Sequence, residues 1–204
     1  TLIEKYLTSR NITLACPNSL RFHPNLRHKD GEYFPAMVGE ITNSLDNAFQ
    51  GIHRTFLQRA GTAKAPLKNQ KLMLGQAKNG VVKLFEATET VALAEGIETA
   101  LSVAQMTEKP VWAALSAGNL KSLPLPNHIL SVEIFADGDE AGTDAATTAA
   151  RKLSIEGRSV RIITAPDGQD FNDLLCADEN DDPTRSPEQL IKRLIDDAAV
   201  FNCP

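Results

Sequence analysis

Two aspartates stand two positions apart at the end of an apolar run, in the segment 131–142 (SVEIFADGDEAG). The alternation of apolar and mixed residues before the pair indicates a short buried strand. Because side chains alternate along an extended backbone, Asp137 and Asp139 should point the same way. Carboxylates at the carboxyl end of a strand in an α/β sheet lie where such folds place ligands. An isolated D-x-D could equally cap the next helix, so its meaning depends on the other acids.

Acidic residues also follow two other predicted strands. Glu95 follows the strand 91–94, and Asp170 and Asp173 follow the strand 159–164. Right-handed crossovers bring these strand ends to one edge of the sheet, where we expect the acids to gather. So many neighbouring carboxylates call for a divalent cation. Hard oxygen ligands suit Mg²⁺ or Mn²⁺, and the lack of histidine at this edge argues against zinc.

The second half of the chain alternates strands and helices, a pattern typical of a parallel sheet. The predicted strands are 91–94, 111–115, 132–136 and 159–164, and the predicted helical segments are 97–105, 120–123, 141–155 and 187–200. Two candidate helix starts lie at the acids themselves, where an aspartate can cap the first turn. The fold class is therefore α/β.

The first half reads as a small α+β unit. It has a predicted helix at 2–10, strands at 20–23, 34–42, 48–57, 72–74 and 81–85, and a mobile basic loop at 58–70. The second and third of these strands form an antiparallel hairpin. We divide the chain into a basic subdomain at 1–88, a sheet domain at 89–176, and an acidic linker with a final helix at 177–204. A fragment beginning near Glu89 is expected to keep its fold and bind Mn²⁺.

Charge is divided unevenly between the halves. Residues 1–83 hold 12 Lys+Arg against 5 Asp+Glu, and residues 84–204 hold 9 against 21. This asymmetry indicates a basic surface for polyanions beside an acidic site for cations.

Composition places the chain among cytoplasmic proteins. No apolar run approaches the ~20 residues that span a membrane, and no secretory signal is present. Cys16, Cys176 and Cys203 form no C-x-x-C pair, which argues against disulfides or structural zinc and for a reducing compartment. Because the chain begins at Thr1 without methionine, we expect a processed protein or a piece of a longer one.

Three segments, in this order, resemble the Toprim domain: ALAEGIETAL, FADGDEAG and DGQDFNDLL. This domain occurs in bacterial-type primases, topoisomerases, recombination proteins and certain nucleases. The intervening WAALSAGNL and the basic unit before it resemble the primases of phages, plasmids and mobile elements. The resemblance covers residues 90–176 closely and 1–89 loosely. It implies a Toprim-like parallel sheet flanked by helices, preceded by a small basic α+β subdomain.

The resemblance assigns roles to the acids. Glu95 matches the family glutamate, and Asp137 and Asp139 match its D-x-D, so these three are the implied catalytic residues and metal ligands. Asp170 and Asp173 fall in the last acidic motif and are implied as further ligands of Mg²⁺ or Mn²⁺.

One position near the first motif is left open. Many bacterial primases carry an acid four residues after the first glutamate, where this chain has Thr99. Glu98 comes one residue earlier, and it either helps at the site or faces solvent.

Basic residues before the sheet domain are the candidates for nucleotide and template binding. They are Arg54, inside a predicted strand, and Lys68 and Lys71 at the following loop. For Lys64 and for Lys68, taken one at a time, a solvated loop residue is as good an explanation as a phosphate-binding residue. His53 is expected to be a packing or surface residue. Cations here would neutralise template or triphosphate phosphates.

Together with these features, the resemblance implies a DNA primase catalytic core: a metal-dependent nucleotidyltransferase that makes short RNA primers from ribonucleoside triphosphates on single-stranded DNA. Two alternatives stay open, a Toprim nuclease using the same acids and a non-catalytic nucleic-acid-binding replication module. The resemblance also implies two partners, a replicative helicase and a zinc-binding template module outside this segment.

Overall fold

The computed structural model describes residues 1–177 and 186–201 and confirms the predicted α/β class. Its helices are α1 (Leu2–Thr8), α2 (Ile97–Thr107), α3 (Ala117–Ser122), α4 (Glu140–Ile155), α5 (Phe171–Cys176) and α6 (Pro187–Asp197). Its strands are β1 (Leu20–Arg27), β2 (Tyr33–Asn43), β3 (Phe49–Phe56), β4 (Lys71–Gly75), β5 (Gly80–Lys83), β6 (Thr90–Ala94), β7 (Val111–Ala113), β8 (Ser131–Ala136) and β9 (Ser159–Thr164). The predicted acidic linker and Cys203 lie outside the described residues.

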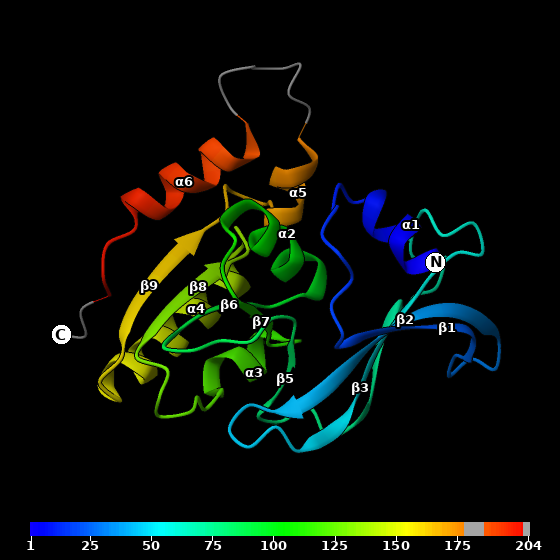
Figure 1. Cartoon of the computed structure of the whole chain (residues 1–204), viewed down its shortest axis with the longest axis horizontal. Coiled ribbons are helices and arrows are strands. Elements are labelled where there is room, and N and C mark those ends of the chain that lie inside the picture. The colour runs from blue at the N-terminus through cyan, green and yellow to red at the C-terminus, as the bar shows by residue number, and fades with distance from the viewer. Residues whose placement is uncertain (178–185, 202–204) are drawn as a thin grey trace.

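The second half forms the predicted parallel sheet, covered on both faces (Figure 1). Its strand order is β7-β6-β8-β9. Along β6, Val91 and Leu93 pack toward α3 and α4, whereas Ala92 and Ala94 pack toward α2 and α5. Burial on both faces explains why these strands are almost wholly apolar.

The two halves share one continuous sheet. The short strand β5 pairs antiparallel with β2 through Val81 and with β7 through Val82. One core also runs through both halves, since Tyr6 and Met37 belong to the same buried cluster as Ile97. The shared sheet and core are the basis for a different prediction, that a fragment beginning near Glu89 does not keep its fold.

The basic segment 58–70, predicted to be a mobile loop, folds back on β3. Leu57 and Lys64 form an isolated antiparallel bridge, and the Ala65 N–H donates to the Phe56 carbonyl over 2.8 Å. Ala65 is fully buried in a small cluster with Phe56. Local backbone pairing therefore holds this segment in place, although its sequence has no apolar periodicity.

The helix α6 packs on α2 through Ile191, which is buried. Beyond it, Val200 forms a bridge with Arg161 of β9. No helix in the described part of the chain is both long and apolar enough to cross a membrane.

Candidate active site

The acidic residues follow three neighbouring strands. Glu95 follows β6, Asp137 and Asp139 follow β8, and Asp170 comes after β9 at the start of α5. Because β8 lies between β6 and β9 and all three are parallel, their carboxyl ends share one edge of the sheet.

Two adjoining cavities lie at this edge. The first, of about 140 Å³, is lined by Glu95, Asp137 and Asp170 together with residues of β3, β4 and α2. The second, of about 210 Å³, is lined by Asp137, Asp139, Asp170 and Asp173. Asp137 and Asp170 line both cavities, so each of the five predicted acids lines at least one of two cavities that share these two residues.

The D-G-D turn is built so tightly that its glycine is required. Asp139 caps α4, and its Oδ1 accepts a 2.6 Å hydrogen bond from the Gly142 N–H. A Cβ at Gly138 would lie 2.0 Å from the Pro166 carbonyl oxygen. Neighbouring backbone therefore fixes the turn that carries the two aspartates.

Gly138→Ala is expected to destabilise the chain by roughly 1–3 kcal/mol, because the added methyl group forces apart two backbone segments. Urea unfolding measures this. Gly118→Ala is the matched control, since nothing lies within 4 Å of its added Cβ and it sits inside α3. That control should be neutral or slightly stabilising. Equal stability of both variants would contradict the tight turn.

Asp137 is the most perturbed acid of the site. Burial, reinforced by the charges of Asp170, Glu95 and Asp139, raises its pKa to about 7, and Lys71 acts in the opposite direction. Its Oδ1 is buried and accepts no hydrogen bond from residues 1–177 or 186–201. A buried carboxylate oxygen without a partner, among other acids, is the arrangement that a cation would complete.

Glu95 is held from the neighbouring strand. Its backbone carbonyl accepts a 2.8 Å hydrogen bond from the N–H of Leu115, just after β7. Burial and the charge of Asp139 raise the pKa of Glu95, while Lys71 and the Ala117 N–H lower it.

Asp170 and Asp173 form a capping box at α5. Asp170 Oδ1 accepts from the N–H groups of Asn172 (2.7 Å) and Asp173 (2.9 Å), and Asp173 Oδ2 accepts from the Asp170 N–H (3.0 Å). The neighbouring Asn172 is buried and donates to the Arg10 carbonyl and to Ser102 Oγ. Both aspartates therefore help to begin a helix as well as line the site.

In residues 1–177 and 186–201, no group of three or more His, Cys, Asp or Glu side chains is arranged to hold a metal ion. Mg²⁺ usually takes only one or two carboxylates directly and keeps several waters. The unpartnered Oδ1 of Asp137 beside Glu95 meets that smaller requirement.

The three basic candidates separate in space. Lys71, the first residue of β4, lines the cavity that holds Glu95 and Asp137. Arg54 lies on the opposite face of β3 from the cavity-lining His53, with its Cζ 5.8 Å from the centroid of the Phe56 ring. Lys68 is exposed and lines neither acidic cavity.

Glu98 does not face solvent, which removes one of the two alternatives for it. It is 3% exposed and lies 3.2 Å from both Lys64 Nζ and Lys71 Nζ, and its Oε1 accepts from the Tyr6 hydroxyl over 2.8 Å. Its lysine partners hold its pKa well below the ordinary value despite the opposing effect of burial.

His53, expected to be a packing or surface residue, is 5% exposed and lines the acidic cavity from β3. Burial lowers its pKa to about 4, so the ring is neutral at pH 7. Its Nδ1 is buried and has no hydrogen-bond partner in the described residues.

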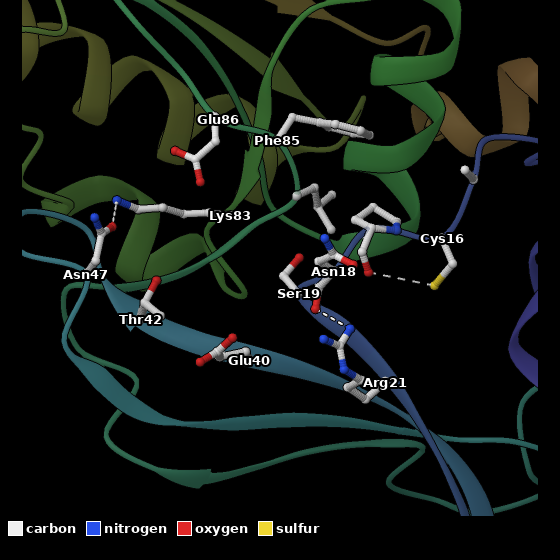
Figure 2. A pocket seen from close by; sticks show the side chains of 13 residues that line it. Cys16, Asn18, Ser19, Arg21, Glu40, Thr42, Asn47, Lys83, Phe85 and Glu86 are labelled. Atoms are coloured by element: carbon white, nitrogen blue, oxygen red, sulfur yellow. Dashed lines mark hydrogen bonds between the residues drawn. The ribbon is translucent and has the colours of Figure 1, made fainter.

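A larger groove, of about 780 Å³, lies between the connector 15–19, β2 and the end of β5 (Figure 2). Lys83 closes one side: its Nζ donates to Asn47 Oδ1 over 2.6 Å and lies 4.1 Å from the centroid of a Trp112 ring. Arg21 donates to the Leu20 carbonyl from another side. None of the predicted site residues lines this groove.

Comparison with solved structures finds the same fold in primase cores. A DNA primase domain from Pseudomonas aeruginosa is 18% identical, with a TM-score of 0.64 over 98% of this chain and 73% of that one. A DnaG primase catalytic domain bound to ssDNA is 17% identical, with a TM-score of 0.61 over 98% and 74%. The primase fragment of the bacteriophage T7 primase-helicase is 14% identical, with a TM-score of 0.52 over 83% and 64%.

No curated protein matches the chain in sequence. Residues 1–84 match a domain of unknown function (DUF7146). Residues 90–196, more than half of the chain, match the Toprim domain, in agreement with the strand-end acids described above. The chain therefore belongs to the Toprim domain family.

Proposed function

We propose that the chain is a primase catalytic core that joins ribonucleotides on a single-stranded DNA template. The observation that carries this proposal is the position of Lys71, which a strand of the basic first half presents to the cavity of Glu95 and Asp137. A polymerase must hold a triphosphate beside its metal site, whereas a nuclease needs only water and a phosphodiester. A lysine ammonium opposite the acids can bind the phosphates of such a triphosphate.

The acids fit a divalent metal. Glu95, Asp137 and Asp139 would be the principal ligands of Mg²⁺ or Mn²⁺, with Asp170 and Asp173 acting through its waters. When bound, the metal neutralises triphosphate charge and makes the 3′-hydroxyl a better nucleophile.

The protein's own part is to hold the two reactants in line. Lys71 would bind the phosphates of the incoming nucleotide. The O3′–Pα bond forms as the bond from Pα to pyrophosphate breaks, and the hydroxyl proton passes to water. His53, neutral and at the wall of the cavity, would donate or accept a hydrogen bond without adding charge.

We assign template binding to the face of β3 opposite His53. Arg54 lies away from the acids, so it would neutralise template phosphates rather than the triphosphate. Lys68 would extend this surface from the folded-back segment. A primase of a phage, plasmid or mobile element would further use a replicative helicase and a separate zinc-binding template module.

Purified chain with Mn²⁺, single-stranded DNA and labelled ribonucleotides tests the proposal. We expect short RNA products, and about a hundredfold less incorporation in Lys71→Met, because a cation aimed at the phosphates is lost. Lys78→Met is the matched control, since this exposed lysine lines neither acidic cavity and should leave incorporation near wild type.

Two outcomes would count against primer synthesis. Nicking of DNA with Mn²⁺, without incorporation, would identify the nuclease alternative. DNA binding without either reaction, by a folded chain supplied with a template module, would identify the non-catalytic one.

A further inference from the structure

Glu98 lies at the junction of the two halves, buried at the start of α2. Its two carboxylate oxygens have different surroundings. Oε1 accepts from the Tyr6 hydroxyl and lies 3.2 Å from Lys64 Nζ, so two residues of the first half fix it. Within the described part of the chain, Oε2 accepts no hydrogen bond, and its ionic contact is with Lys71 Nζ, 3.2 Å away.

Lys71 is the more exposed partner in this pair. Its side chain is 41% exposed, against 4% for Glu98 and 24% for Lys64. Its ammonium lies near the backbone that follows Glu95: a Cβ added at Gly96 would be 3.9 Å from Lys71 Nζ, and Lys71 lines the same cavity as Glu95 and Asp137. A lysine this close has a second set of anionic partners within the same cavity.

These two sets of partners compete for one ammonium. If Lys71 paired with Glu95 or Asp137, it would occupy carboxylate oxygens that a metal ion needs. The buried Glu98 offers the stronger partner, because it is desolvated and its orientation is already fixed by Tyr6 and Lys64.

We propose that Glu98 is a positioning residue that holds the Lys71 ammonium away from Glu95 and Asp137. The two acids then remain free for the metal, and the ammonium keeps a fixed place beside them for a triphosphate. Lys71 lowers the pKa of Glu98, Glu95 and Asp137 alike, in agreement with a cation that lies between them. The inference rests on the proposed metal site.

Mn²⁺ affinity, measured by calorimetric titration of the full chain, tests the proposal without any assay of activity. In Glu98→Gln we expect binding about tenfold weaker, because Mn²⁺ must displace a released lysine from its ligands. In the double variant Glu98→Gln/Lys71→Met the affinity should return to the wild-type value or above it, since the competing cation is gone.

Lys64→Met is the matched control. It also removes an ion pair of Glu98, but it leaves the Glu98–Lys71 contact in place, and Mn²⁺ affinity should stay near wild type. If Glu98→Gln does not fold, Glu98→Asp keeps the charge and shortens the side chain. It should weaken Mn²⁺ binding to a smaller extent, and Lys71→Met should again restore it.

The outcomes separate this inference from the proposed function. A wild-type chain that binds no Mn²⁺ would overturn the metal site, and the inference with it. A wild-type chain that binds Mn²⁺, with Glu98→Gln unchanged, would overturn the inference alone. Weak binding that Lys71→Met fails to restore would reduce Glu98 to a purely structural residue.

Discussion

Replacing Asp137 with asparagine is expected to abolish the stabilisation that Mn²⁺ gives to the folded chain. In the wild type, that stabilisation should reach about 2.7 kcal/mol at a hundredfold excess of metal over its dissociation constant. The metal-free variant should be as stable as the wild type or more so, because it removes a buried charge that Asp170, Glu95 and Asp139 repel. Thermal unfolding with and without millimolar Mn²⁺ measures both effects.

Asp144→Asn is the control for this variant. Asp144 lies on the exposed face of α4, pairs with Lys121 and lines neither acidic cavity, so the response to Mn²⁺ should persist. If Mn²⁺ does not raise the melting temperature of the wild type, or raises that of Asp137→Asn by the same amount, the metal site at Asp137 is wrong.

The pH dependence of metal-free stability provides a second signature of Asp137. Its pKa is about 7 in the folded chain, against an ordinary value of 3.8, so the folded state binds more protons between those values. Stability should therefore fall as pH rises from about 4 to about 7, and Asp137→Asn should lack this contribution. Mn²⁺ should suppress the loss in the wild type, because it binds the ionised carboxylate.

The acidic site could be predicted because its geometry follows from chain order. Glu95, Asp137 and Asp170 each follow a strand of one parallel sheet, and parallel strands end at the same edge. What the sequence did not reveal is that β8 lies between β6 and β9, which makes the three acids neighbours.

Of the first-half residues that line the site, Lys71 was predicted from the sequence, but His53 could not be, because strand pairing decides which face of β3 meets the acids. Arg54 and His53 are adjacent in sequence and point to opposite faces. The register that pairs Gly39 with His53, and the bridging of β2 to β7 by the short strand β5, turn His53 toward the site. No local pattern in those residues contains that information.

Glu98 was uncertain for a similar reason. Its hydroxyl partner, Tyr6, lies 92 residues earlier in the chain, and both of its lysines belong to the basic half. An acid near the start of a helix normally faces solvent or supports the helix dipole. Here Tyr6 of α1 and Lys64 of the folded-back segment 58–70 contact the carboxylate of Glu98 and keep it from solvent.

A fragment beginning at Glu89 is expected to lose cooperative folding, although the Toprim match begins just beyond that point. Removing β5 turns β7, whose residues are all buried, into an exposed apolar edge strand. Trp112, the one tryptophan of the chain, donates from its Nε1 to the Phe85 carbonyl and packs against Lys83, and both partners would be lost. Tryptophan emission should shift to longer wavelength, and urea unfolding should become broad.

A fragment beginning at Gln76 distinguishes the effect of losing β5 and Phe85 from the effect of losing the core shared with the first half. It keeps β5 and Phe85, so the environment of Trp112 should recover, but it still lacks Tyr6 and the lysine partners of Glu98. We expect native-like emission with lower stability than the full chain, because the buried core that Tyr6 and Met37 share with Ile97 is lost. If the Glu89 fragment instead unfolds cooperatively with the emission of the full chain, the Toprim sheet does not need the basic half. The continuous core would then be a contact between two autonomous units.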